Sequence, residues 1–458
     1  MKTFCTKNLA KVALIVSISI ISCHKDDAPV LPPQTINKSK ASNTYSSEFI
    51  NSYFGLMCKV SKSTPGFFPP QVARAYGYVG VAAYEAVVNG IANAQSLAGQ
   101  LNGLSSLPKP VTGEEYNWAI SSNAAIAEMM REMFDKKLSD ASRVSVDSME
   151  NATLSILSSG VSADIVSRSI QYGKDITAAL YQYSTTDGGH ESYLDPYQLP
   201  FSLPPDSFCW VPTGAVKTPV SPHWGTNRPF LQADVDNTVP AAHVKYSSGA
   251  GTDFYNQAME VYNQVKNNTS DQIAIAKYWA DDPFNTCTPT GHTFNILTQL
   301  LQENNATLEK ASVAYARLAI AENDAFVACW KGKFQYVLIR PVSYIKLYID
   351  PNFTTVIGTP AFPSYTSGHS CEIGAGSKVF ISLFTNGNGN YQFTDESQLQ
   401  YGFMPRSYTN FNAMAEECAA SRFYAGIHYP MDNESGLICG KAVGDNVNNL
   451  IQWPTNIR

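Results

Sequence analysis

Apolar residues recur every three to four positions along most of the chain, which is the spacing of amphipathic helices. Segment 70–96 shows this pattern in Val72, Ala75 and Val79, and Pro70 lies near its start, where a helix tolerates proline. The same pattern predicts further helices over 114–137, 140–159, 162–184, 252–266, 270–281, 290–303, 307–340, 367–384, 408–421 and 430–452. Alternating patterns typical of strands are scarce. We therefore predict an all-α fold class, with two helical bundles forming one large domain.

The helical pattern is interrupted over residues 188–250, which hold many Pro, Gly and aromatic residues and no long periodic run. A long ordered connection in a compact protein is often functional. We expect an N-terminal helical half over 46–250, which includes this connection, and a C-terminal helical half over 251–458, which carries the catalytic motifs.

The first residues have the pattern of a targeting segment. Residues 1–22 contain three lysines and no acidic residue, followed by an apolar run that is too short to cross a bilayer. The sequence that ends at Cys23 resembles a bacterial lipobox, so we expect a signal peptide over 1–22, a lipidated Cys23 and a flexible tether over 23–45. The alternatives are an ordinary secretory signal or a buried helix. The expected location is a bacterial outer membrane lipoprotein, periplasmic or surface-exposed, attached by its lipid anchor only.

Composition excludes several classes of protein. With 44% hydrophobic and 15% charged residues, the chain is too apolar for a disordered protein. The formal net charge of -6, which becomes -9 without the three leader lysines, argues against a nucleic-acid partner. Cys5 and Cys23 belong to the leader and the lipid site, and seven cysteines remain. An odd number leaves at least one free thiol even in an oxidising compartment.

Three short motifs supply polar chemistry. In the first, Lys333 and Arg340 are seven residues apart, so on one continuous helix they would share a face. Two cations on a mostly apolar stripe are costly unless a partner neutralises them. The alternative is a pair of surface cations whose stems cover apolar surface.

The second motif runs from Pro363 to His369 and precedes the apolar run 371–383. Ser367 is placed to cap that helix, and the free backbone N–H groups of Gly368 and His369 would form an anion site. The alternative is a plain helix cap beside a half-exposed histidine.

The third motif places Arg422 at the end of a helix and Gly426 at a turn, with Pro430 at the start of the last helix. His428 lies just before that start. Asp432 lies in the first turn, where it can orient the His428 ring or raise its basicity. The alternative is a structural turn with a capping carboxylate.

Together the three motifs contain three cations, a serine hydroxyl, a glycine amide and two histidines, which are the groups needed to hold a phosphate-like tetrahedral oxyanion. One histidine can attack or coordinate the central atom, and the other can transfer protons.

The order of these motifs resembles the type 2 phosphatidic acid phosphatase and vanadium haloperoxidase superfamily over about residues 330–445. Trp330, Phe362 and the stretch from Trp279 to His292 resemble the vanadium-dependent haloperoxidase branch, and are similar to the bacterial lineage that includes flavobacterial iodoperoxidases.

This resemblance implies that orthovanadate is the cofactor and phosphate a competing ligand. His428 would bind the vanadium with Asp432 behind it, and His369 would bond the apical oxygen and act as acid and base. Hydrogen peroxide and a halide, iodide or bromide, would react to hypohalous acid, which would pass to a small organic acceptor. The equatorial oxygens would be held by Lys333, Arg340, Ser367, Gly368 and Arg422, and the halide pocket lined by Trp330 and Phe362.

Two other functions use the same residues. A soluble acid phosphatase would use His428 as the nucleophile that forms a phosphohistidine, with His369 protonating the leaving group. A non-catalytic surface lipoprotein would only bind the anion. Outside the motifs, we expect His292 to be a satisfied core residue rather than a distant partner of the site, and Gly436, Gly440 and Gly444 to form a close-packing seam on the last helix.

Overall fold

The structure is a computed structural model that describes residues 39–198, 201–202, 204, 206–387 and 389–455. All of these residues belong to one compact unit. The expected signal peptide, Cys23 and most of the expected tether lie outside the described residues. The final tether positions are described, and there the Ser42 hydroxyl is buried and donates to the Val87 carbonyl at 3.2 Å. The chain is therefore ordered before the predicted tether boundary at residue 45.

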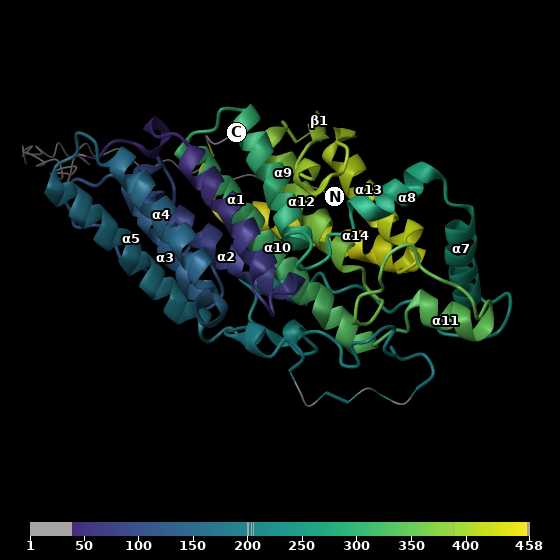
Figure 1. The fold of residues 1–458 in the computed structure, drawn as a ribbon. Coiled ribbons are helices and arrows are strands. Elements are labelled where there is room, and N and C mark those ends of the chain that lie inside the picture. Colours follow the sequence, from purple (N-terminus) through teal and green to yellow (C-terminus); the bar gives the residue numbers. More distant parts are fainter. Residues whose placement is uncertain (1–38, 199–200, 203, 205, 388, 456–458) are drawn as a thin grey trace, which may run out of the picture. The chain divides into compact units, whose positions relative to one another are not determined.

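Helices form most of the described secondary structure, which confirms the predicted fold class (Figure 1). The longer helices of the N-terminal half are α1 (Glu48–Ser63), α2 (Pro69–Glu85), α3 (Trp118–Phe134), α4 (Asp140–Leu157) and α5 (Ala163–Ser184). Those of the C-terminal half are α7 (Asp253–Asn267), α8 (Ser270–Tyr278), α9 (Thr288–Glu303), α10 (Leu308–Tyr336), α11 (Pro341–Tyr348), α12 (Gly368–Phe384), α13 (Phe411–Tyr424) and α14 (Pro430–Leu450). No helix in the described ranges is both long and apolar enough to cross a membrane.

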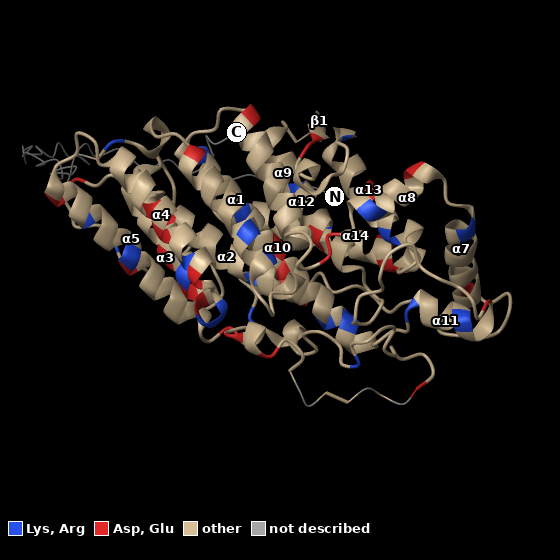
Figure 2. Ribbon diagram, in the orientation of Figure 1, with Lys and Arg blue, Asp and Glu red and all other residues tan. Residues whose placement is uncertain are grey.

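Helix α10 connects the two halves, because it packs against α2 on one side and against α12 and α14 on the other. Nearly all of its residues from Leu308 to Trp330 are buried, including the polar Arg317, Glu322, Asn323 and Asp324, so protein surrounds this part of the helix. The outer helices carry exposed charges. Figure 2 shows acidic and basic positions interleaved along α3 and α4, where Arg131 bonds Glu128, Asp147 and Glu150.

The predicted seam between α12 and α14 is confirmed. A Cβ atom at Gly440 would overlap the carbonyl oxygen of Cys371, and one at Gly444 would lie 2.6 Å from the carbonyl oxygen of Ala375. The two helix backbones therefore approach closely along this line, since only glycine leaves the space. The seam holds the first turn of α14 against the first turn of α12, where the second and third motifs lie.

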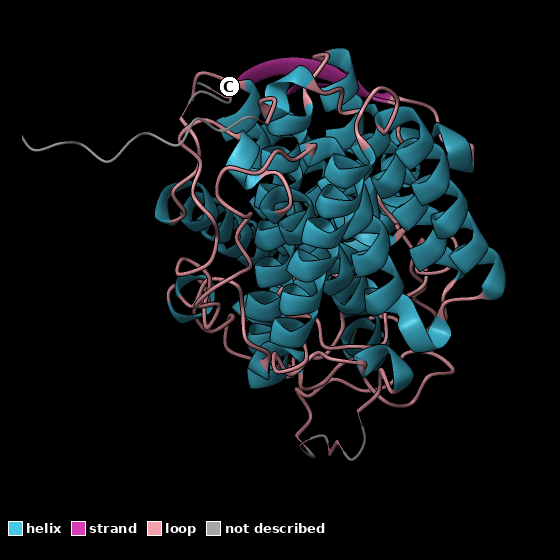
Figure 3. Cartoon of the chain, turned by 90° about the vertical axis from the view of Figure 1, so that its left-hand side faces the viewer, coloured by secondary structure: helices cyan, strands magenta, loops and turns pink. Residues whose placement is uncertain are grey.

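Four parts of the chain differ from the sequence-based prediction. Helix α1 was not predicted, and the helix predicted over 70–96 ends at Glu85, whose carboxylate accepts a hydrogen bond from the Leu97 backbone. A two-stranded antiparallel hairpin, β1 (Asn390–Asp395) and β2 (Arg406–Asn410), was also not predicted. Figure 3 shows this strand pair at the edge of the helical part.

The helix predicted over 307–340 is broken, which is the largest correction. Val337 adopts a left-handed conformation with φ of 49°. Its carbonyl accepts from the Trp210 N–H at 2.6 Å, and the next turn of chain pairs with Phe208. The long connection therefore draws the chain out of the helix. Lys333 lies in the last turn of α10 while Arg340 caps α11, so the two cations do not share a helix face.

Candidate active site

The three motifs meet where the end of α10 lies against the first turns of α12 and α14. The Lys333 ammonium donates to the carbonyl oxygens of Pro363 at 2.9 Å and Ser364 at 3.0 Å, and also to that of Thr366. Arg340 donates to the Phe362 carbonyl at 2.8 Å and lies 3.0 Å from the His428 ring. Lys333, Arg340 and His428 therefore lie in one buried cluster, although Arg340 belongs to a different element than expected.

His428 is held by its neighbour in the first turn of α14. Its Nδ1 atom lies 2.8 Å from Asp432 Oδ2, and the same carboxylate accepts from the Ser364 hydroxyl at 2.5 Å. A carboxylate partner assigns the proton to Nδ1 and leaves a lone pair on Nε2. Burial, reinforced by Arg340 and Lys333, holds the pKa of His428 well below its usual range. The ring is therefore neutral, and its Nε2 lone pair accepts a hydrogen bond from Arg340 at 3.0 Å.

Three cations gather at the site. Lys333, Arg340 and Arg422 are all buried, and Asp432 is the carboxylate closest to them in the third motif. Burial lowers the pKa of Lys333 to about 8 and also lowers the pKa values of Arg340 and Arg422. Asp281 and Asp282 act on Arg422, whereas Asp432 is the carboxylate that acts on both Lys333 and Arg340. Two buried cations that share one carboxylate create a favourable position for an anion.

Helix α12 begins as its sequence predicts. Ser367 is the N-cap and its hydroxyl accepts from the Ser370 N–H at 3.4 Å, while Ser367 N–H donates to the Asp432 carbonyl at 3.0 Å. The N–H groups of Gly368 and His369 have no partner within a helix that starts here. These amides therefore complement the three side-chain cations around the same space.

Two nitrogen atoms at this point are buried without a hydrogen-bond partner among the described residues. They are Nε2 of His369 and Nε of Arg422, and both residues line a pocket of about 340 Å³. Buried polar atoms in proteins are nearly always paired, so unpaired ones adjoining a pocket indicate a ligand that bonds them, with Arg422 Nε as a donor and His369 Nε2 as an acceptor. Burial, with further contributions from Arg422 and His292, holds the pKa of His369 well below its usual range, so this ring is neutral too.

The predicted halide-pocket residues lie next to Lys333. Phe362 forms part of the pocket wall, and Trp330 packs behind it with the two ring centroids 5.0 Å apart. The Lys333 ammonium lies 5.0 Å from the Phe362 ring and 5.6 Å from the Trp330 ring. The Trp330 indole N–H donates to the Val220 carbonyl at 3.3 Å, so the long connection also forms part of this wall.

His292 is a satisfied core residue, as predicted, but its two partners were not foreseen. Its ring lies between the carboxylates of Asp281 and Asp395, at 3.0 Å and 2.9 Å. Asp395 ends strand β1, and no signal in the sequence links that hairpin to His292. The stretch from Trp279 to His292, which was noted in the sequence, was the signal that marked this region.

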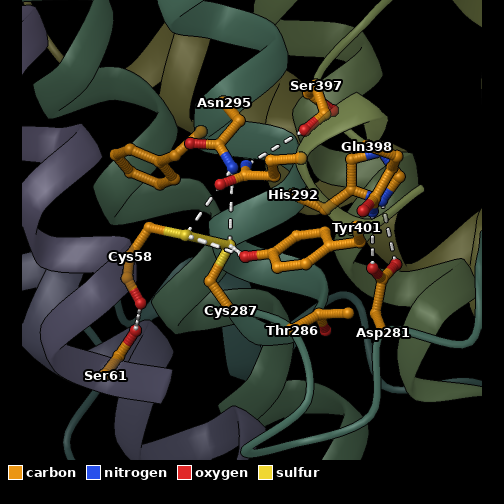
Figure 4. Close-up of a disulfide and its surroundings, with 12 residues drawn as sticks. Cys58, Ser61, Asp281, Thr286, Cys287, His292, Asn295, Ser397, Gln398 and Tyr401 are labelled. Carbon is orange, nitrogen blue, oxygen red and sulfur yellow. Dashed lines mark hydrogen bonds and ion pairs between the residues drawn. A yellow bond between two sulfur atoms is a disulfide. The ribbon is translucent and has the colours of Figure 1, made fainter. Parts of the chain in front are cut away.

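A disulfide joins Cys58 of α1 to Cys287 at the start of α9 (Figure 4). Tyr401 and Asn295 contact its sulfur atoms at 3.4 Å or slightly more. The other five described cysteines are buried and form no disulfide, which confirms the expectation of at least one free thiol. They are Cys209, Cys329, Cys371, Cys418 and Cys439.

The fold and the site together define a helical-bundle protein with a buried, cation-lined site for a tetrahedral oxyanion. Comparisons with known proteins agree. A family model described as the VCPO second helical-bundle domain matches residues 313–456. A solved structure described as that of the first bacterial vanadium-dependent iodoperoxidase is 30% identical to this chain, covers 90% of this chain and 99% of its own, and gives a TM-score of 0.81. The chain therefore belongs to the vanadium-dependent haloperoxidase family.

More distant structures share the fold. The holo and apo forms of a bacterial vanadium-dependent chloroperoxidase are 13% and 14% identical to this chain, each over 86% of it, with a TM-score of 0.58. The matched regions include 95% of the holo chloroperoxidase chain and 96% of the apo chain. A comparison with curated proteins found no match.

Proposed function

We propose that this protein is a haloperoxidase that uses hydrogen peroxide to oxidise iodide or bromide to hypohalous acid at a bound vanadate. One observation carries this proposal: the neutral His428 ring directs its Nε2 lone pair at Arg340 within a cluster of three buried cations, beside unpaired nitrogens of His369 and Arg422. A tetrahedral oxyanion with an electrophilic centre and one protonated oxygen would satisfy all of these groups at once, because the O–H would donate to His369 Nε2.

The chain supplies a complete set of contacts for vanadate. His428 Nε2 would bind the central atom, and Asp432 keeps the ring in the tautomer that this requires. The oxygens would be held by Lys333, Arg340, Ser367, Gly368 and Arg422. When bound, vanadate supplies a Lewis-acidic centre that activates hydrogen peroxide without changing its own oxidation state.

His369 is the proton-transfer group in this proposal. Its lowered pKa leaves Nε2 unprotonated, so this atom can take a proton from incoming hydrogen peroxide and return it to a leaving oxygen as water. Lys333 stays close to the same space and polarises the oxygen that the halide attacks. The residues of the chain therefore divide into those that hold negative charge and one that moves protons.

The pocket supports halide and organic substrates rather than large polar ones. Its walls are mostly apolar, with Phe362, Pro360 and Val220 among them and the carboxylates of Asp281 and Asp282 at one side. A polarisable halide is less strongly hydrated than most anions of its size, and an apolar wall beside Lys333 suits it. A small organic acceptor entering the same pocket would take up the oxidised halogen.

The test is to remove bound anions from the purified protein, add orthovanadate, and assay iodide and bromide oxidation by hydrogen peroxide. We expect turnover that depends on vanadate and is suppressed by excess phosphate, the competing ligand. Hydrolysis of phosphate esters that vanadate inhibits, without halide oxidation, would instead identify an acid phosphatase, because the His428 lone pair also suits a phosphohistidine. Anion binding with neither activity would identify the non-catalytic lipoprotein.

We also propose that the protein is an exported lipoprotein anchored through Cys23. The disulfide between Cys58 and Cys287 supports an oxidising compartment, since such bonds are rare in the cytosol. In a bacterial host, Cys23→Ala is expected to release the protein from the membrane fraction to the soluble fraction. Unchanged partitioning of this variant would contradict the proposed anchor.

A further inference from the structure

A short stretch of backbone between α8 and α9 holds two of the site's polar groups. The Trp279 carbonyl accepts from the Arg422 guanidinium at 2.6 Å, and the His369 ring is hydrogen-bonded to the Ala280 backbone. The next residue, Asp281, has a left-handed φ of 47°, which a non-glycine residue adopts only when its surroundings hold it there. The position of this stretch therefore determines where Arg422 and His369 point.

His292 holds this stretch through a buried ion pair. Its Nδ1 atom lies 3.0 Å from Asp281 Oδ2, and its Nε2 atom lies 2.9 Å from Asp395 Oδ2. A neutral imidazole has one N–H and would direct its lone pair at one of these carboxylates, whereas an imidazolium donates to both. The geometry therefore requires a protonated ring. Burial opposes this charge, but the two carboxylates outweigh burial and raise the pKa of His292 to about 10.

Two further contacts complete the support. Gln398 donates to the other oxygen of Asp281 at 2.9 Å, so that carboxylate is fixed from two directions (Figure 4). The Trp279 ring stacks on the His292 ring with centroids 4.5 Å apart and planes 26° apart, an arrangement that favours a cationic imidazole. His292 thus contacts the stretch at both of its ends.

We propose that His292 is a positioning residue of the anion site, which holds the carbonyls of Trp279 and Ala280 in place for Arg422 and His369 by way of Asp281. The inference rests on the proposed function to the extent that an oxyanion occupies the site. His292 does not line the pocket, and it touches none of the residues expected to hold the anion. Its influence on binding is therefore indirect.

Asp281→Asn tests this inference by the sign of its effect. Removing a negative charge close to Arg422 would by electrostatics alone strengthen anion binding. Loss of positioning would weaken it. We expect Asp281→Asn to weaken the binding of orthovanadate and of inorganic phosphate by about tenfold or more in isothermal titration calorimetry, the size typical of lost support around a bound group. Binding that is unchanged or tighter would overturn the inference.

Asp395→Asn is the matched control, because it makes the same chemical change on the opposite side of the His292 ring. Asp395→Asn should weaken anion binding less than Asp281→Asn does. The reason is that no hydrogen bond joins Asp395 to the described backbone of Trp279–Asp281. Equal losses in the two variants would indicate a general loss of stability. If Asp281→Asn does not fold, His292→Gln replaces it, because glutamine removes the positive charge that binds Asp281, and the same weakening is expected.

A crystal structure of the folded variant gives a readout that does not depend on the proposed function. We expect the Trp279–Asp281 backbone to move and the Arg422 bond to the Trp279 carbonyl to be lost, and an unmoved stretch would overturn the inference. If the wild-type protein binds phosphate without oxidising halide, the proposed function fails while the phosphate affinities still decide the role of His292. If it binds neither anion, the proposed function fails and the crystal structure decides.

Discussion

The two histidines of the site differ in what holds their rings. His428 bonds the Asp432 carboxylate at 2.8 Å, which keeps its Nε2 lone pair directed at the cations, whereas His369 bonds only the Ala280 backbone. We expect His428→Ala to abolish orthovanadate binding in calorimetry. His369→Ala should lower binding by less than about tenfold but lower turnover of iodide by about a hundredfold or more, the usual contribution of a proton-transfer group. Equal loss of binding in both variants would contradict this division of roles.

Lys333 should make anion binding depend on pH. Its lowered pKa of about 8 means that the ammonium loses its charge as the pH rises through 8, before a lysine in water would. Because the charged form attracts the anion, affinity is full below this pH and falls above it, by up to about tenfold per pH unit for one proton.

The measurement compares the wild type with Lys333→Arg, whose guanidinium stays charged. Vanadate changes its own protonation over this range, but that change is common to both proteins and cancels in the ratio of their affinities. We expect the ratio of wild-type to variant affinity to fall steadily from about pH 8 to about pH 10. A constant ratio would show that Lys333 does not titrate there.

At the scale of helices and strands, local signals in the sequence were reliable where the controlling contacts are local. Ser367 caps α12 and Pro430 begins α14 as predicted, because capping and proline geometry depend on the next few residues. The predicted end of α10 was wrong, because Val337 leaves the helix to bond Trp210, which lies more than a hundred residues earlier in the chain. Periodicity does not contain such a contact.

The same distinction applies to the site. The motif residues were identified from the sequence because the chemistry of an oxyanion restricts them to a few types at fixed spacings. Their supporting partners were not: Asp395 comes from an unpredicted hairpin, and Ser364 donates to Asp432 across 68 positions of sequence. A partner that acts only through another side chain has no spacing rule of its own, so it appears only when the fold is known.

The seam between α12 and α14 predicts a specific loss of stability. Gly440→Ala places a methyl group against the Cys371 carbonyl, and the two helices must separate to accept it. We expect a loss of about 1–3 kcal/mol in the free energy of unfolding, measured by urea denaturation. Orthovanadate affinity should also fall, because separation moves His428 away from Ser367.

Gly55→Ala in α1 is the control for this substitution, since a Cβ atom there has nothing within 4 Å. The same change of residue should stabilise that helix by about 0.5–1 kcal/mol and leave anion affinity alone. If Gly440→Ala were as harmless as Gly55→Ala, the close approach of α12 and α14 would not be needed for the site.

At the scale of the whole molecule, the described part of the chain is held together by two long-range features. Helix α10 packs against both halves, and the disulfide joins Cys58 to Cys287 across 229 positions of sequence. The disulfide fixes α1, which belongs to the N-terminal half, to the start of α9, which carries His292. Cross-linking residues so far apart restricts the unfolded chain strongly, because it closes a very long loop.

The double variant Cys58→Ser/Cys287→Ser should therefore be less stable than the wild type by about 2–5 kcal/mol, the range found when native disulfides are removed. Thermal unfolding of both proteins with and without dithiothreitol measures this difference. The reductant should lower the wild-type melting temperature to that of the variant and leave the variant unchanged, because the five free cysteines take no part in disulfides. A reductant effect of equal size in both proteins would place the stabilisation elsewhere. Since the disulfide lies outside the cation cluster, the folded variant should keep its orthovanadate affinity within about threefold.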